Sequence, residues 1–315
     1  MSLALTLLHF LGRHAVLALF FGVFVGLALP GLAGHFRPLL SPMVILILMG
    51  TLLRIDWSSL LHNLRQPRRA LIMFLWLQAA APALTWLILL PFDLPPALAA
   101  GIVLMAAAPP IMSAAAIALM VGLDGPLALV GAMIATLAAP LTVPPMALWL
   151  LGLDVQVSAW ALMSRLAMVV IIAFTGAAVL RAWIGAPRLA AHANAIDGLI
   201  VVGMLVFAVA IMDGVTDTLI ARPAVFWGWT LAAFLANPLL QIMGAAVFWR
   251  LGGKRALTTA LLTGNCNMGL VLAALPPDAD PDIGLYFAVA QFPMFMLPAM
   301  LVPLYRALLA KFQSQ

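Results

Sequence analysis

Two asparagines, Asn265 and Asn267, lie beside two glycines in an otherwise apolar part of the chain, where residues 264–270 read GNCNMGL. An amide side chain both donates and accepts hydrogen bonds, so it can bind a solute or an ion, or it can satisfy backbone groups that an interrupted helix leaves free. Glycine and asparagine also weaken helices. The stretch therefore predicts a helix break at Gly264, with amides that either line a cavity or satisfy the broken backbone.

Other polar residues in apolar surroundings extend this set of candidates. Gln78 carries an amide that must contact protein or water, and we expect it to contact an ion or the protein core. Gln291 precedes Pro293, and Asn237 and Gln241 flank Pro238, so capping of the proline kink is favoured there over substrate contact. Ser113 and Thr263 lie next to the breaks and are included as candidate ligands.

The composition shows what surrounds these groups. Of 315 residues, 66% are hydrophobic and 8% are charged, whereas soluble domains carry about 25% charged residues. Apolar runs near the length needed to cross a bilayer recur along the chain, which predicts one all-α integral membrane domain over residues 1–315. Since Cys266 is the only cysteine, an intrachain disulfide is excluded. No nucleophile–base pair or metal constellation occurs at membrane depth, so we expect neither an enzyme nor a resident cofactor.

Ten spans are predicted, near residues 15–33, 39–54, 70–91, 96–120, 126–151, 158–181, 197–213, 222–249, 255–275 and 283–305. With the N-terminus inside, twelve of the fifteen basic residues fall on the inner side, which predicts that both termini are cytoplasmic in an inner (cell) membrane. The net charge of +5 then belongs to a cytoplasmic membrane face, and nucleic-acid binding is not expected.

Several segments are expected at the membrane interfaces. Residues 1–14 are expected to be an interfacial lead-in, and 57–69 a short interfacial helix. Arg165 is expected to snorkel to the outer interface, with anion recognition as the alternative. The tryptophans are expected near span ends as interfacial anchors; they are residues 57, 76, 86, 149, 160, 183, 227, 229 and 249.

Helix-breaking features recur at a nearly constant offset, which indicates an internal repeat. Pro82 and Pro238 are 156 residues apart, and the APP of residues 108–110 precedes the GNC of 264–266 by about 155. Five spans per half is an odd number, so the second half must enter the membrane from the opposite side. We therefore expect two inverted repeats, about 1–152 and 153–315, whose fourth spans break at Pro109-Pro110 and at Gly264.

Three stretches resemble the bile acid:sodium symporter family. They are PMVILILMGTLLRIDWSSLLHNLRQPRRALIMFLWLQAAAPALTWLI at 42–88, AAAPPIMSAAAIALMVGLDGPLALVGAMIATLAAPLTVP at 106–144 and GNCNMGLVLA at 264–273. The resemblance implies ten helices in two inverted five-helix repeats, with a panel domain and a core domain. The core would hold the third to fifth and eighth to tenth helices, and the discontinuous fourth and ninth would cross. The resemblance also implies alternating-access transport of an organic anion, typically driven by sodium.

The chain departs from the family pattern at the sodium ligands. Ala114 and Ala115 replace the usual Ser-Asn, and Leu262 replaces a Glu. Cys266 replaces a Gln and Ala132 a hydroxyl residue. Thr136, Gln78 and Asn267 match the family and are retained as candidate ligands. Because hard cations prefer oxygen ligands, the resemblance leaves at most one sodium site, formed by Gln78 and backbone carbonyls.

The resemblance implies a secondary transporter of a small organic anion, coupled to at most one sodium ion, with the lipid bilayer as its other partner. The alternatives are an uncoupled facilitator or channel-like carrier, an auxin-efflux-carrier-like protein and a metalloid exporter. The substrate, the coupling ion, the direction of transport and the oligomeric state stay open.

Overall fold

The computed structural model describes residues 15–55, 57, 67–151, 159–275 and 279–313. Within these ranges the regular structure is helical, and the only strand-like pairing is an isolated antiparallel bridge between Pro110 and Cys266. The lead-in expected at 1–14 and most of the helix expected at 57–69 lie outside the described residues. The described chain is therefore all-α, as the sequence predicted.

Seven helical stretches of the described residues are long and apolar enough to cross a membrane. They are Pro30–Leu53, Arg68–Leu89, Gly125–Trp149, Trp160–Ile184, Ala193–Ala221, Pro223–Leu251 and Pro281–Phe312. The shorter apolar helices Ala18–Ala28 and Pro96–Ala107 fall in the first and fourth predicted spans. The fourth and ninth predicted spans do not appear as long helices because each is interrupted where the sequence predicted a break.

The chain divides into two compact units. Unit 1 comprises Met1–Asp56 and Met168–Gly228, and unit 2 comprises Trp57–Ala167 and Trp229–Gln315. Both are discontinuous in sequence, because the chain leaves each unit and returns to it.

Unit 1 is built around one central helix, α13 (Ala193–Ala210), which packs against α2 and α4. Small residues allow these helices to approach closely. A Cβ on Gly26 of α2 would lie 2.7 Å from the carbonyl oxygen of Val209, and one on Gly50 of α4 would lie 2.7 Å from Ile200. The helices of unit 1 are α2 (Ala15–Ala28), α3 (Pro30–Phe36), η1 (Arg37–Leu39), α4 (Leu40–Leu53), most of α11 (Ala159–Ile184), α12 (Ala186–Ala191), α13 and α14 (Val215–Ala221).

Ion pairs join the ends of the helices in unit 1. Arg37 lies 2.6 Å from Asp213, and Arg54 contacts both carboxylate oxygens of Asp197 at 2.7 and 3.2 Å. These are the two ion pairs found among the described residues. Because they are largely exposed, they orient the helix ends more than they stabilise the fold.

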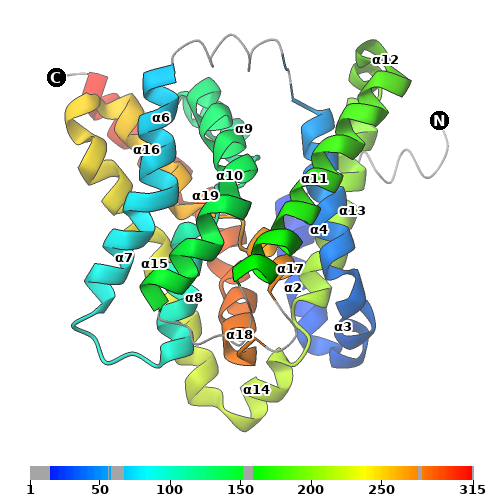
Figure 1. Ribbon diagram of the computed structural model, residues 1–315, viewed down its shortest axis with the longest axis vertical. Helices are drawn as coiled ribbons and strands as arrows, with labels where there is room; N and C mark the ends of the chain where they lie inside the picture. The colour runs from blue at the N-terminus through cyan, green and yellow to red at the C-terminus, as the bar shows by residue number, and fades with distance from the viewer. Residues whose placement is uncertain (1–14, 56, 58–66, 152–158, 276–278, 314–315) are drawn as a thin grey trace. The chain divides into compact units, whose positions relative to one another are not determined.

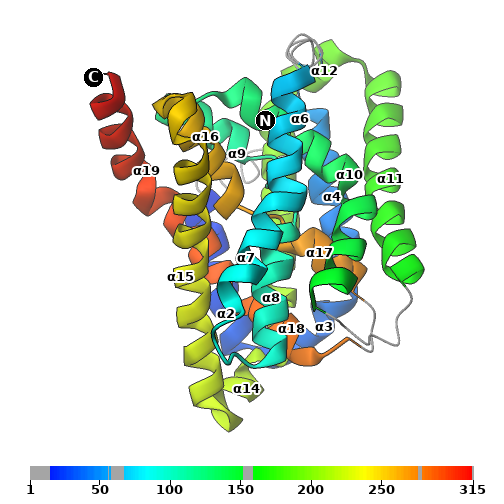
Figure 2. The ribbon, with the colours of Figure 1, turned by 60° about the vertical axis from the view of Figure 1, so that its left-hand side comes forward.

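Unit 2 carries the interrupted helices (Figure 1). Figure 2 shows α6, η2 and α7 running on as one long rod. The helices of unit 2 are α6 (Pro67–Leu75), η2 (Trp76–Ala80), α7 (Ala81–Leu89), α8 (Pro96–Ala107), α9 (Ala114–Val121), α10 (Gly125–Leu151), α15 (Pro223–Phe248, from Trp229 onward), η3 (Trp249–Leu251), α16 (Gly253–Gly264), α17 (Met268–Ala274), α18 (Pro281–Val289) and α19 (Gln291–Gln313).

The η2 segment is one turn of π-helix, and Pro82 accounts for it. Proline has no N–H to bond the residue four positions earlier, and its ring crowds that residue's carbonyl. The carbonyl concerned belongs to Gln78, inside the π turn, and the N–H of Ala81 reaches back five residues to Trp76. The wider turn places Gln78 in the interior of unit 2, where its side chain is 2% exposed.

Candidate functional site

Two helices of unit 2 stop part-way and resume after a short extended stretch. Helix α8 ends at Ala107, residues 108–113 follow, and α9 begins at Ala114. Ala108 has an extended backbone (ψ 140°), as expected for a residue that precedes a proline. Helix α16 ends at Gly264, and α17 begins at Met268. Both breaks therefore lie where the sequence predicted them, at Pro109-Pro110 and at Gly264.

The two breaks are bonded to each other through their backbones. The N–H of Ile111 donates to the carbonyl oxygen of Asn265 at 2.9 Å, and the N–H of Asn267 donates to that of Pro109 at 2.6 Å. These bonds flank the facing residues Pro110 and Cys266, which form a two-residue antiparallel bridge. Each break thus supplies partners for backbone groups that the other leaves free. The expectation that the breaks lie together is confirmed.

Gly264 is required by close packing rather than by an unusual backbone. Its φ is not positive, unlike that of four other glycines among the described residues. A Cβ on Gly264 would overlap the Cγ of Gln241 and would lie 2.8 Å from the carbonyl oxygen of Asn237. Glycine therefore lets α15 approach the end of α16 closely enough for side chains of α15 to reach the break.

A chain of buried hydrogen bonds uses this approach. Asn237 of α15 donates through Nδ2 to the carbonyl oxygen of Gly264 at 2.7 Å. Gln241 donates to Asn237 Oδ1 at 2.6 Å, and the hydroxyl of Tyr305 donates to Gln241 Oε1 at 2.7 Å. We expected Asn237 and Gln241 to cap the kink at Pro238. That expectation is wrong for both residues. Asn237 bonds across to the end of α16 and so ties α15 to the break, and Gln241 bonds the side chains of Asn237 and Tyr305.

Gln78 occupies a comparable place at the other break. Its Nε2 lies 3.5 Å from the carbonyl oxygen of Ala107, the last residue of α8, and its Oε1 accepts a 2.6 Å bond from the hydroxyl of Thr142. The predicted core contact of Gln78 is therefore present. The bond to Ala107 is at the long limit for a hydrogen bond, so Thr142 is the stronger partner.

Thr263 joins α16 to the π turn. Its hydroxyl donates to the carbonyl oxygen of Thr259 at 2.7 Å and accepts a 2.9 Å bond from the indole Nε1 of Trp76. Trp76 is 4% exposed and Trp229 is 5% exposed. For these two tryptophans the expected interfacial position is wrong. Trp76 is buried because its N–H has a hydroxyl partner inside the unit, which an indole in the interior needs.

The two asparagines of the second break differ in their bonding. Asn267 is the N-cap of α17, and its Oδ1 accepts a 3.1 Å bond from the N–H of Leu270. Asn265 is 1% exposed and donates through Nδ2 to the carbonyl oxygen of Leu261 at 2.8 Å, while its Oδ1 is buried without a partner. Trp57 Nε1 is the other such atom among the described residues. An orphaned buried acceptor is costly, so Asn265 Oδ1 is available to a donor from a bound solute.

The remaining candidates lie in different settings. Ser113 is exposed at the start of α9, and Thr136 is fully buried and donates to the carbonyl oxygen of Ala132 within its own helix. Gln291 is buried at the start of α19 and donates to the carbonyl oxygen of Phe287. Cys266 is buried, and its Sγ lies 3.2 Å from the carbonyl oxygen of Thr263. These contacts bring Thr263, Asn265 and Asn267 together at the second break, whereas Thr136 and Gln291 bond only within or next to their own helices.

The positions where the chain departs from the family pattern are packed with apolar groups. Ala114, Ala115 and Leu262 belong to one buried cluster, and Ala132 is also fully buried. The buried polar side chains of the described residues are all neutral amides and hydroxyls. This part of the site therefore offers a hard cation no carboxylate.

A comparison with models of known protein families identifies the family of this chain. The model of the Sodium Bile acid symporter family matches residues 41–222, more than half of the chain. The chain belongs to the sodium bile acid symporter family. The match includes Gln78 and the break at Pro109-Pro110, and it stops at Arg222, before the second break. No curated protein matches the chain.

Family membership settles the general class of activity. Members of the sodium bile acid symporter family are secondary transporters and not enzymes, so the chain is a multi-pass membrane protein that moves a small molecule. The resemblance identified in the sequence is therefore confirmed.

Sequence reasoning missed three residues that hold the breaks in place. Thr142, Trp76 and Tyr305 bond to Gln78, Thr263 and Gln241, respectively. Each is an ordinary residue of a membrane helix, and each partner lies more than sixty positions away. The sequence indicates only that the buried amides of Gln78, Gln241 and Asn237 need hydrogen-bond partners. It does not indicate which residues those partners are.

Proposed function

We propose that this transporter moves a small organic anion by alternating access and binds it where the two interrupted helices meet. The observation that carries the proposal is the reciprocal backbone bonding between the breaks, with the orphaned Oδ1 of Asn265 beside it. Irregular backbone at membrane depth is tolerated only where protein buries it or where it lines a cavity. The organic anion follows from the family resemblance. Ser113, exposed at the positive end of the α9 dipole, supports an anionic ligand.

The proposed architecture has ten spans in two inverted repeats, about 1–152 and 153–315, with unit 1 as the panel and unit 2 as the core. Equivalent backbone hydrogen bonds, separated by a nearly constant number of residues, support the proposed repeats. The N–H of Ala108 bonds to the carbonyl oxygen of Leu104, and that of Asn265 bonds to Leu261, 157 positions further along the chain. The prolines inside α10 and α19 also correspond, with Pro140 and Pro298 separated by 158.

Side-chain amides reinforce the comparison between the halves. The amide of Gln78 points to the last carbonyl of α8, and that of Asn237 points to the last carbonyl of α16. The two amides are 159 positions apart, and the two carbonyls are 157 apart. In each proposed repeat, an amide side chain of the third helix contacts the last carbonyl of the segment that precedes the break in the fourth helix.

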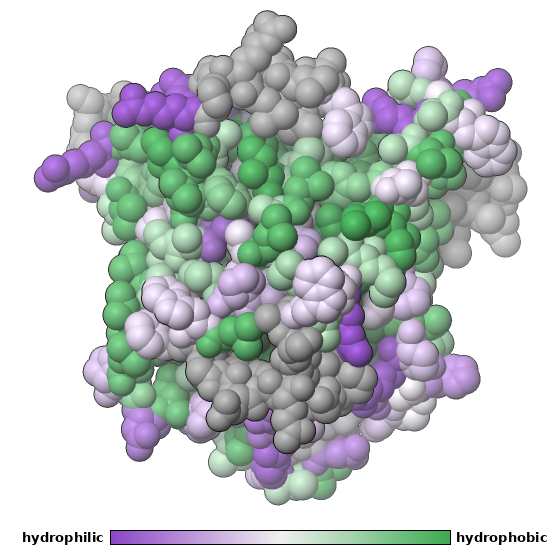
Figure 3. All heavy atoms as spheres, viewed as in Figure 1, coloured by the Kyte–Doolittle hydropathy of each residue, from purple (hydrophilic) through white to green (hydrophobic). Residues whose placement is uncertain are grey.

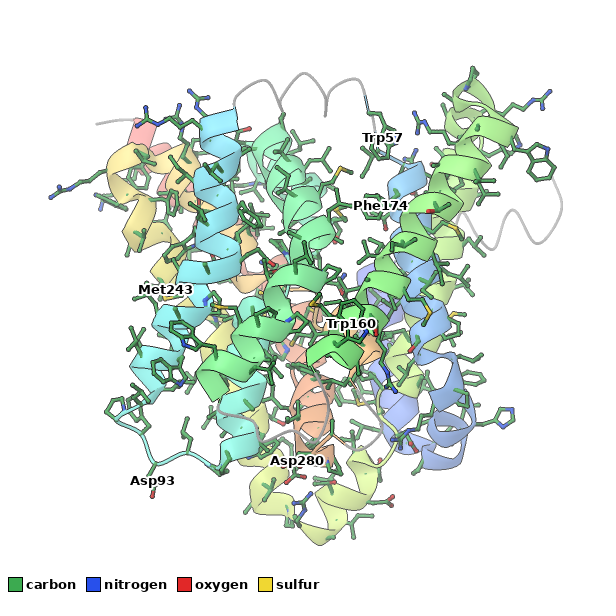
Figure 4. All side chains as sticks on the ribbon, viewed as in Figure 1. Trp57, Asp93, Trp160, Phe174, Met243 and Asp280 are labelled. Atoms are coloured by element: carbon green, nitrogen blue, oxygen red, sulfur yellow. The ribbon has the colours of Figure 1, made fainter. Side chains whose placement is uncertain are left out.

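The proposed orientation has both termini in the cytoplasm. Basic residues occur at the start of α6 and the start of α16, whereas Asp93 and Asp280 lie at the opposite end of unit 2 (Figure 4). This separation supports the orientation because Lys and Arg are retained on the cytoplasmic side.

For coupling, we propose at most one sodium ion. The backbone carbonyls from Thr263 to Asn267 all accept hydrogen bonds, so a cation would have to use their second lone pairs together with the unpartnered Oδ1 of Asn265. Gln78 Oε1 is likewise engaged by Thr142. The neutrality of the buried polar residues also supports the uncoupled facilitator as the second candidate, since a proton relay needs ionisable groups.

Uptake into proteoliposomes tests the proposal. A panel of small organic anions is first screened for a rise in the thermal midpoint of the purified protein, with and without sodium, because selective binding to the folded state stabilises it. Anions that stabilise the protein are then supplied as labelled substrates. Saturable uptake that the Asn265→Ala variant loses is expected. Uptake that is unchanged in Asn265→Ala and Asn267→Ala would refute the proposed site. Uptake of a metalloid in place of any anion would favour the exporter alternative.

A further inference from the structure

Unit 2 has an open crevice on its surface, separate from the two breaks. It lies between α6, α10 and the junction of α15 with α16. The residues that line it are Arg69, Ile72, Met73, Leu127, Phe248, Leu251, Arg255 and Thr259. Figure 3 shows hydrophilic side chains gathered near the end of unit 2 where α6 begins, above a band of apolar surface.

The crevice combines two guanidinium groups with apolar walls. Arg69 is exposed in the first turns of α6, and Arg255 is partly buried in the first turn of α16. Neither takes part in the ion pairs found among the described residues. The aspartate closest in sequence to the α10 wall, Asp124, accepts a bond from the N–H of Leu127, which caps that helix.

The other side chains that line the crevice, Thr259 apart, are apolar. Met73 and Phe248 form a buried floor at 3% and 7% exposure, while Ile72 and Leu251 are 42% and 50% exposed. A ligand that matches this surface needs an anionic group at one end and a hydrocarbon segment next to it.

We propose that the crevice binds an anionic phospholipid of the cytoplasmic leaflet, with its phosphate on Arg69 and Arg255 and an acyl chain along Ile72 and Leu251. Basic pockets between membrane helices on the cytoplasmic side suit such headgroups, and guanidinium groups bind phosphate with paired hydrogen bonds. A lipid is the occupant because Ile72 and Leu251 expose apolar surface in the same crevice as the two guanidinium groups, and a free phosphate would leave that surface uncovered.

A lipid at this place would act on the helix that leads to the second break. Arg255, Thr259 and Thr263 recur every four residues and so lie on one face of α16. Thr259 lies 3.9 Å from the sulfur of Met73, and Thr263 accepts the indole N–H of Trp76. A phosphate shared by Arg69 and Arg255 adds a second connection between α6 and α16, beside the bond from η2 to Thr263, and stabilises the packing beside the break.

The test compares two double variants that remove the same charge. Arg69→Gln/Arg255→Gln removes the guanidinium groups of the crevice, while Arg68→Gln/Lys254→Gln removes the exposed cations one residue earlier in each helix, which do not line it. The full-length protein in neutral detergent is titrated with phosphatidylglycerol, with phosphatidylcholine and with inorganic phosphate, and the shift of the thermal midpoint gives the affinity.

Phosphatidylglycerol is expected to raise the midpoint of the wild-type protein, and phosphatidylcholine and inorganic phosphate are not. The affinity for phosphatidylglycerol should fall by roughly tenfold or more in Arg69→Gln/Arg255→Gln, and little in Arg68→Gln/Lys254→Gln. Equal losses in both variants would overturn the proposal in favour of a diffuse basic surface. A shift with inorganic phosphate as large as that with lipid would mean a free-anion site. If the first double variant does not accumulate, the single variant Arg69→Gln tests the same prediction, because Arg69 is exposed.

Discussion

Replacing Asn237 by leucine should weaken the fold of unit 2 at the second break. Leucine has a similar size but can neither donate to the carbonyl oxygen of Gly264 nor accept from Gln241 Nε2. In the wild-type protein these bonds are 2.7 and 2.6 Å long, and Asn237 is 1% exposed. The variant therefore leaves one acceptor and one donor buried without partners.

The magnitude follows from those two groups. A buried polar group left unpaired costs about 1–3 kcal/mol, so two such groups give about 2–6 kcal/mol. Hydrogen bonds between membrane helices contribute about 0.6 kcal/mol on average and at most about 1.7 kcal/mol in double-mutant cycles, which points to the low end of that range. We expect the free energy of unfolding to fall by about 2 kcal/mol, a change of about thirtyfold in the folding equilibrium.

Reversible unfolding in mixed micelles measures this loss. The matched control is Asn194→Leu, the same substitution at an exposed position of unit 1. A double-mutant cycle between Asn237→Leu and Tyr305→Phe tests the connection, because both bond to Gln241. The two losses should not be additive. If Asn237→Leu is no less stable than Asn194→Leu, the bonds of Asn237 do not hold the break and the reasoning is wrong.

Further predictions concern the breaks themselves. Asn267→Ala should abolish transport while the protein still inserts and folds, because the loss of one N-cap bond is small beside the insertion energy of the apolar spans. Cys266→Ala should leave transport nearly unchanged. Loss of transport in Cys266→Ala together with retained transport in Asn267→Ala would point to thiol chemistry. Gly264→Ala should destabilise the protein by about 1–3 kcal/mol, measured by the same unfolding assay, because its Cβ would overlap Gln241; an unchanged stability would contradict the close packing. Uptake should depend weakly or not at all on sodium, since Leu262, Ala114 and Ala115 are buried among apolar groups; a steep dependence with more than one sodium per turnover would refute this.

The positions of the breaks could be predicted from the sequence because their causes are local. Prolines at 109 and 110 remove backbone donors, and the Gly-Asn stretch after residue 263 weakens the helix. The meeting of the breaks followed from the repeat offset. These features needed no knowledge of which side chains touch.

The π turn and the cross-helix bonds could not be predicted in this way. Pro82 indicated a distortion, but the choice between a kink and a π turn depends on how neighbouring helices pack. Asn237 was expected to serve its own helix, and only the close approach allowed by Gly264 shows that it serves α16 instead. The expected place of Trp76 was wrong for the same reason, since its partner Thr263 is 187 positions away.

The central claim is that the two interrupted helices meet at their breaks, and disulfide trapping tests it most directly. Because Cys266 is the only cysteine, the variant Pro110→Cys contains a single pair of thiols. Residues 110 and 266 face each other between two flanking hydrogen bonds, an arrangement that places their Cα atoms about 4.5 Å apart, within the range of a disulfide. Mild membrane-permeable oxidation of Pro110→Cys should give an intramolecular disulfide by mass spectrometry. The control Trp249→Cys, an exposed position of unit 2 that the 12-residue helix α16 separates from Cys266, should give none. A folded Pro110→Cys protein that retains two free thiols after oxidation would contradict the account.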